Sequence, residues 1–193
     1  ADTQHISIVH ASEVVEMNEH PVTAIRKKKD ASVVVAFDLV RLGRADAVVS
    51  AGNSGATMAA AIRKLGRLKG IARPGIASAF PTLKGPVVLM DIGANVDCKP
   101  IHLFQFGVMA SAYSQMIGGA DPRVGLLTIG EETGKGNSLI KETYPILERS
   151  PLNFVGNVEG RDIYQGDIDV IVCDGFVGNI CLKVSEGLAE VVM

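Results

Sequence analysis

Short apolar runs rich in β-branched residues alternate with polar turns and helix-like stretches along most of the chain. Helices are expected over 30–42, capped at Asp30 or Ser32 and stopped at Gly43, and after Ser54, Pro100, Asn137 and Gly178. Continuous apolar strands between helices predict an α/β layered domain, with a mostly parallel sheet and helices on both faces. The predicted strands are ISIVH (6–10), DAVVS (46–50), PVVLMD (86–91), RVGLLTI (123–129), NFVG (153–156) and DVIVCD (169–174).

Length and composition favour one globular domain over 1–193. The chain has 193 residues, 47% of them hydrophobic, and the helix after Gly178 is still apolar at Met193, so we expect a piece of a longer chain. Its three cysteines form no CxxC pair, which is typical of a reducing compartment. With no leader-like start and no apolar run of about 18 residues, the sequence predicts a cytoplasmic protein. A net charge of -2 and the absence of Trp disfavour nucleic acid as a partner.

Glycine, asparagine, aspartate and lysine gather directly after the apolar runs. In an open α/β sheet, ligands bind beyond the carboxyl ends of the strands. Each loop alone fits ordinary turn chemistry, because these residue types tolerate positive φ and cap helices. Together the four predict a shared site. They are SAGNSG (50–55), DIGANVDCKP (91–100), TIGEETGKGN (128–137) and CDGFVGNICLK (173–183).

Standard nucleotide and metal motifs do not fit these loops. GxGxxG is absent after the strands, and GEETGKGN has three residues between Gly130 and Gly134 where a P-loop has four. Gly136 also stands where a P-loop places Ser or Thr. HExxH, GxSxG and EF-hand patterns are missing, and the four histidines lack metal-ligand spacing. We therefore expect no metal and no cofactor, and we disfavour a nucleotide hydrolase.

Three positions are candidates for chemistry, each with a plain structural alternative. The small residues Asn53, Ser54 and Gly55 at a helix start suit a phosphate held by backbone N–H groups, or simply close packing. The Lys135 ammonium could reach a phosphate or an oxyanion, or could be solvated. The Asn179 amide could orient a substrate, or could cap a helix.

The chain resembles the bacterial PlsX family, the acyl-ACP:phosphate acyltransferases of phospholipid synthesis. The resemblance rests on SAGNSGA, LMDIGANVDCKP, PRVGLL, GKGN, NFVGNVEGRD and VCDGFVGNICLK, supported by HPVTAIRKKKDAS and GRLKGIARP. It implies a fold like phosphate acetyltransferase and the isocitrate dehydrogenase group, a homodimer, and catalytic roles for Lys135 and Asn179. The family begins with a further strand and an Asp-Ala-Met-Gly-Gly-Asp-like loop, which this sequence lacks.

The implied reaction is attack of orthophosphate on the thioester of a long-chain acyl-ACP, which gives an acyl phosphate for a downstream glycerol-3-phosphate acyltransferase. Because phosphate is itself a nucleophile, catalysis can rest on positioning and charge stabilisation. In this hypothesis Lys135 neutralises phosphate or the oxyanion, Asn179 orients the carbonyl, and 53–55 hold phosphate. Four further residues would shape the cleft or form hydrogen bonds in it: Asp91, Asn95, Asp97 and Asp174. Of these, Asp97 or Asp174 would take part in proton transfer.

Two basic groups could receive acidic ACP, or could be solvated helix faces: 26–29, and Arg63, Lys64, Arg67, Lys69 and Arg73. The apolar segment 184–193 suits peripheral contact with the inner membrane face or core packing. Three rival functions remain: an NAD(P)-dependent dehydrogenase on the same fold, a short-chain phosphate acyltransferase that uses acyl-CoA, and a non-catalytic scaffold for ACP or membrane. The dehydrogenase would need a cluster of metal-binding aspartates, which these loops do not supply.

Overall fold

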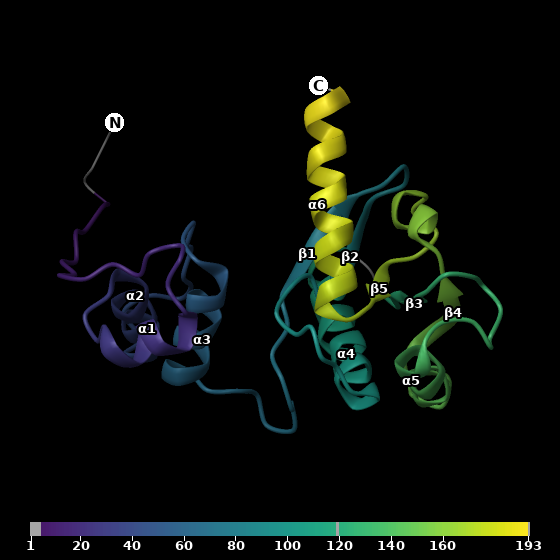
Figure 1. Ribbon diagram of the computed structural model, residues 1–193, viewed down its shortest axis with the longest axis horizontal. Coiled ribbons are helices and arrows are strands. Elements are labelled where there is room, and N and C mark those ends of the chain that lie inside the picture. The colour runs from purple at the N-terminus through teal and green to yellow at the C-terminus, as the bar shows by residue number, and fades with distance from the viewer. Residues whose placement is uncertain (1–4, 119, 193) are drawn as a thin grey trace. The chain divides into compact units, whose positions relative to one another are not determined.

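A computed structural model describes residues 5–118 and 120–192 (Figure 1). The chain forms two compact units, residues 1–69 and 70–193. Each unit has its own hydrophobic core and is described by itself.

The first unit consists of three helices, α1 (Pro21–Lys27), α2 (Ser32–Arg41) and α3 (Ser54–Lys64). The core of this unit contains Ile25, Val34 and Phe37, packed against Ala56 and Ala60 of α3. Helix α2 lies within the predicted range 30–42 and ends before Gly43, whose φ of 67° suits the residue after a helix. Its N-cap is Ala31, without a side-chain cap, so the predicted cap at Asp30 or Ser32 is wrong. The sequence analysis did not predict α1.

The strands predicted at 6–10 and 46–50 do not form. In the described part of the first unit, β pairing is limited to a single bridge between Glu13 and Ala31. Ile8 and Val49 are almost fully exposed. A strand is stable only when its N–H and C=O groups pair with a neighbour, and these two segments have no partner strand among the described residues of their unit.

The second unit is a five-stranded sheet with helices on both faces. The strands are β1 (Ala77–Pro81), β2 (Pro86–Met90), β3 (Arg123–Leu127), β4 (Asn153–Val158) and β5 (Val170–Val172), and their order is β1-β2-β5-β3-β4. Strand β1 pairs with β2 antiparallel, and all other pairs are parallel. This confirms the predicted mostly parallel α/β sheet. The antiparallel edge strand β1 was missed, because ASAFP is short and weakly apolar.

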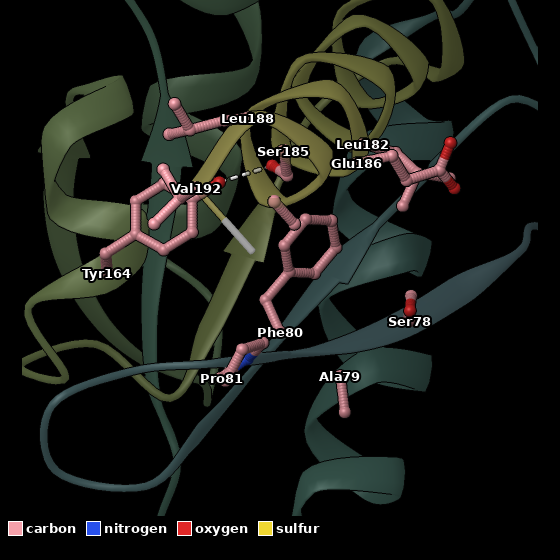
Figure 2. Close-up of a pocket in the computed structure, with 11 residues that line it drawn as sticks. Ser78, Ala79, Phe80, Pro81, Tyr164, Leu182, Ser185, Glu186, Leu188 and Val192 are labelled. Atoms are coloured by element: carbon pink, nitrogen blue, oxygen red, sulfur yellow. Dashed lines mark hydrogen bonds between the residues drawn. The ribbon is translucent and has the colours of Figure 1, made fainter.

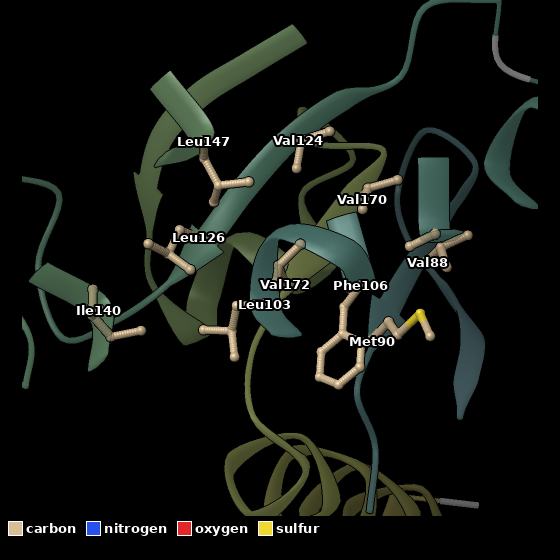
Figure 3. Close-up of a cluster of buried hydrophobic side chains, with 11 residues drawn as sticks. Val88, Met90, Leu103, Phe106, Val124, Leu126, Ile140, Leu147, Val170 and Val172 are labelled. Atoms are coloured by element: carbon tan, nitrogen blue, oxygen red, sulfur yellow. The ribbon is translucent and has the colours of Figure 1, made fainter. Parts of the chain in front are cut away.

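Alternate residues of β2 face the two sides of the sheet. Val88 and Met90 join one core cluster with Leu103 and Phe106 of α4 (Pro100–Ile117), as Figure 3 shows, and α5 (Ser138–Glu148) covers the same face. Leu89 joins the cluster on the other face, against α6 (Gly175–Val192) and the 3₁₀ helix η1 (Gly160–Tyr164). Burial on both faces explains the continuous apolar runs.

The helices predicted after Pro100 and Asn137 form as expected. Asn137 caps α5, since its Oδ1 accepts the Ile140 N–H at 3.0 Å. Helix α6 begins at Gly175, three residues before the predicted start at Gly178. Among the described residues, no helix is long and apolar enough to cross a bilayer.

Candidate functional site

Three of the four polar loops lie at one edge of the second unit's sheet. The loops 91–100, 128–137 and 173–183 follow β2, β3 and β5, which are neighbouring parallel strands in the order β2-β5-β3. The carboxyl ends of parallel strands meet at the same edge. The structure therefore groups these loops as the sequence predicts.

A buried carboxylate organises the loop after β2. Asp91 is completely buried, and its two oxygen atoms accept four N–H groups: Ile76 N and Ala94 N at 3.1 Å each, Asn95 N at 2.7 Å, and Asn95 Nδ2 at 2.8 Å. The Asn95 amide also donates to the carbonyl oxygen of Pro74 at 2.8 Å. With these bonds made, Asp91 and Asn95 shape the loop and have few atoms left for a ligand.

The start of α6 packs directly on this loop. The Gly175 N–H donates to Asn95 O at 2.7 Å, and a Cβ added at Gly175 would lie 2.7 Å from that same oxygen. A Cβ at Gly178 would lie 1.9 Å from the carbonyl oxygen of Asp91. Glycine is therefore required at both positions by close approach of the two backbones.

Asp174 caps α6. Its Oδ1 accepts the N–H groups of Phe176 at 2.9 Å and Val177 at 3.0 Å, which is N-cap geometry. The alternative interpretation of Asn179 as the cap is therefore wrong. Asn179 lies in the second turn of α6, is exposed, and is near Gly93, since a Cβ at Gly93 would lie 3.4 Å from Asn179 Oδ1. Its amide is placed at the junction of two of the loops.

The loop after β3 presents Lys135. The Lys135 side chain is half exposed, with its Nζ 4.0 Å from Glu132 Oε1. Its backbone N–H donates to Glu132 O at 2.9 Å, and the aliphatic part of the side chain lies close to Gly130. Gly136 has a φ of 97°, a conformation that favours glycine.

Asp97 is exposed on the loop after β2, and Arg73 Nη1 donates to its carbonyl oxygen at 2.9 Å. Nearby, His102 Nδ1 accepts the Lys99 N–H at 3.1 Å at the start of α4. Burial, followed by the charges of Arg73 and Lys99, lowers the pKa of His102. His102 is thus kept neutral as part of a helix cap.

The thiols in this part of the chain are not activated. Burial raises the pKa of Cys98 to about 11, and burial raises the pKa values of Cys173 and Cys181 as well. A nucleophilic cysteine needs a lowered pKa. None of the three described cysteines has the lowered pKa that a nucleophilic thiol needs.

The fourth loop, 50–55, belongs to the first unit. Asn53 caps α3, because its Oδ1 accepts the Ala56 N–H at 3.0 Å, and its Nδ2 donates to Met17 O at 3.1 Å. A Cβ at Gly55 would lie 2.7 Å from Pro21 Cγ, so close packing already requires glycine there. Ser54 is the first helical residue. The role of 53–55 in holding phosphate stays a prediction.

Part of each basic group is used internally. Lys28 Nζ pairs with Glu19 at 2.6 Å, Lys64 Nζ pairs with Asp38 at 2.6 Å, and Arg63 Nη1 donates to Ile25 O at 2.9 Å. These contacts favour a structural role for the three cations.

An apolar groove of about 480 Å³ lies between β1 and α6 (Figure 2). None of the predicted site residues lines it. Its lining includes Phe80, Leu182 and Val192, and Tyr164 and Ser185 hydrogen-bond through their hydroxyl groups. Leu182 is one helical turn after Asn179. Separately, Phe176, Ile180, Val184 and Leu188 of α6 are exposed at a spacing of four residues.

The sequence analysis missed one residue beside the loop that follows β3. Asn157, near the end of β4, is 7% exposed, and its Nδ2 donates to Glu132 O at 2.8 Å. The signal was a polar amide inside FVGNV (154–158), whose other residues are apolar or glycine.

Comparison with known proteins places these loops in a family. The model of the fatty acid synthesis protein family matches residues 1–193. A phosphate acyltransferase of Elusimicrobium minutum is 57% identical over 191 residues, which are 98% of this chain and 56% of that protein. A phosphate acyltransferase of Geobacter sulfurreducens is 60% identical over 188 residues, 97% of this chain and 54% of that protein. The chain thus spans about half the length of the curated relatives it matches.

Two solved structures share the fold. A EutD phosphotransacetylase from Staphylococcus aureus superposes with a TM-score of 0.63 at 19% identity, covering 98% of this chain and 68% of the other. A phosphotransacetylase from Streptococcus pyogenes gives a TM-score of 0.57 at 20% identity, covering 90% and 63%. The phosphate acetyltransferase-like fold expected from the resemblance is confirmed.

Proposed function

Since this chain belongs to the fatty acid synthesis protein family, also called the PlsX family, we propose that the complete protein transfers a long-chain acyl group from acyl-ACP to orthophosphate. The observation that carries the proposal is the meeting of three polar loops at the carboxyl edge of β2, β5 and β3. Lys135 and Asn179 stand exposed on two of them. The relatives named phosphate acyltransferase support phosphate as the acceptor.

In this reaction a phosphate oxygen attacks the thioester carbonyl carbon. The carbon–sulfur bond breaks, the thiolate leaves and takes up the proton that the attacking hydrogen phosphate gives up, and the products are acyl phosphate and free ACP. Negative charge develops first on the carbonyl oxygen, so a fixed cation or amide donor lowers the barrier. We assign the cation to Lys135 and the amide to Asn179, which orients the carbonyl. The raised thiol pKa values support a mechanism without an acyl-cysteine.

The carboxylates divide into two kinds. Asp91 and Asp174 are buried and bind backbone N–H groups, which supports a role in building the loops. Asp97 is exposed, so it is the better candidate for a role in proton transfer. Asn53, Ser54 and Gly55 remain our proposal for a phosphate-holding helix start, with Gly55 required for packing as well.

The proposal includes the partners that the resemblance implies. These are acidic ACP at basic surface groups, a second copy of the chain, the inner membrane face, and a downstream glycerol-3-phosphate acyltransferase. The exposed apolar positions of α6 support an association surface, because contiguous exposed apolar side chains mark interaction sites.

The alternative is a short-chain phosphate acyltransferase, favoured by the fold shared with phosphotransacetylases. To separate the two, the complete protein is given equal concentrations of palmitoyl-ACP and acetyl-CoA with phosphate. We expect turnover of palmitoyl-ACP only. Faster turnover of acetyl-CoA would support the alternative, whereas ACP binding without turnover would support the scaffold.

A further inference from the structure

The buried Asn157 amide lies against the loop that carries Lys135. Its Nδ2 donates to the carbonyl oxygen of Glu132 at 2.8 Å, and the backbone N–H of Lys135 donates to the same oxygen at 2.9 Å. Two hydrogen bonds therefore converge on one atom. One of them comes from strand β4, and the other comes from the lysine itself.

The loop needs such an attachment because little else fixes the lysine. Half of the Lys135 side chain is exposed, and its contact with Glu132 Oε1 at 4.0 Å is weak in water. Lys135 stands between Gly134 and Gly136, which leave the backbone many accessible conformations. The backbone of this loop sets where the lysine side chain starts, and that backbone is attached to β4 through Asn157.

The Asn157 amide is used as a donor. Its Oδ1 is buried and has no hydrogen-bond partner in the described part of the chain. Burial of an unpaired acceptor costs about 1–3 kcal/mol, so packing alone does not explain a polar side chain here. The donated bond to the Lys135 loop does explain it.

We propose that Asn157 is a positioning residue for Lys135, holding the ammonium where it meets phosphate or the developing oxyanion. This inference rests on the proposed acyl transfer to phosphate. It adds a residue that touches no substrate and acts through the backbone of the loop.

The test is a double-mutant cycle in the complete protein. Asn157→Ala and Asn157→Asp both remove the amide donor, and Asn157→Asp keeps the size of the side chain. We expect each to lower kcat for acyl phosphate formation by about 10- to 100-fold, because small misplacement of a catalytic group has costs of that size. In a Lys135→Ala background the same changes should lower kcat by less than about 3-fold, because the group they position is already gone.

The matched control is Asn153→Ala, at the other end of β4, whose Nδ2 donates to Asp121 Oδ2 at 3.0 Å and to Asp121 O at 3.3 Å. It should leave kcat unchanged. Equal losses with and without Lys135, or full activity of the Asn157 variants, would overturn the proposal.

Amide hydrogen exchange keeps the proposal testable where the variants fail to fold. In the unmodified protein the Lys135 N–H should exchange at least about tenfold more slowly than a free amide. Exchange at the free rate would contradict the anchor. If the unmodified protein forms no acyl phosphate, the proposed function fails on its own, while the exchange measurement still reports on the attachment of the loop.

Discussion

Asn95 binds the buried Asp91 carboxylate twice, through its backbone N–H at 2.7 Å and its Nδ2 at 2.8 Å. Because Gly175 then donates to Asn95 O, this pair connects the loop after β2 to the first turn of α6. The helix that presents Asn179 is thus connected through Asn95 to a buried carboxylate.

Asp91→Asn should destabilise the protein by about 3 kcal/mol. Each oxygen of Asp91 accepts two of the four N–H donors, so two donors would then face an NH₂ group in a fully buried site. Denaturant unfolding monitored by circular dichroism measures the loss. Asp97→Asn is the control on the same loop; because Asp97 is exposed, it should change stability by less than about 0.5 kcal/mol. Equal stability of the two variants would contradict the role of Asp91.

Gly178→Ala should cost at least about 3 kcal/mol, because its Cβ would overlap the backbone oxygen of Asp91. Gly187→Ala, in the same helix, meets nothing within 4 Å and should stabilise the protein by about 0.8 kcal/mol through helix propensity. Thermal unfolding of the two variants tests this contrast, which fails if Gly178→Ala melts at or above the temperature of the unmodified protein.

His102 should make stability depend on pH near neutrality. Its pKa is lowered in the folded state, so above the unfolded pKa of about 6.5 the neutral imidazole makes its full contribution to stability. As pH falls from about 6.5 toward the folded pKa, the unfolded chain binds more protons and stability declines. His102→Asn keeps an acceptor for the Lys99 N–H without titrating. The free energy of unfolding, measured with urea from about pH 7.5 to about pH 5.5, should therefore fall more steeply for the unmodified protein than for this variant. Parallel curves would refute the assignment.

Lys135→Ala should lower kcat for acyl phosphate formation by about 100-fold in the complete protein, as loss of an oxyanion donor does elsewhere. Lys183→Ala is the control, since Lys183 is exposed on α6 and pairs with Glu186 at 2.6 Å. Steady-state kinetics with both variants folded would show the difference. Unchanged turnover of the Lys135 variant would remove it from the mechanism.

The sequence predicted the central strands well because β2, β3 and β5 are buried on both faces, which produces continuous apolar runs that are hard to mistake. It failed at 6–10 and 46–50, where apolar composition indicates a strand but pairing depends on a partner that composition cannot reveal. The edge strand β1 escaped notice for the opposite reason, because an edge needs few apolar residues.

The candidate site, like the strands, was predicted only in part. The grouping of three loops followed from strand order at the sheet's carboxyl edge. The sequence did not show which polar groups stabilise the fold. Asp91 and Asp174 cannot be told apart from Asp97 in the sequence, and only their burial and hydrogen bonds distinguish them. Asn157 was missed because its role depends on a contact with Glu132, 25 positions away.

Acyl transfer to phosphate is tested most directly by incubating the complete protein with palmitoyl-ACP and radiolabelled orthophosphate and separating the lipid products. The account predicts a labelled acyl phosphate that forms with release of free ACP and disappears in the Lys135→Ala and Asn179→Ala variants. Absence of labelled lipid from folded, ACP-binding protein would contradict it.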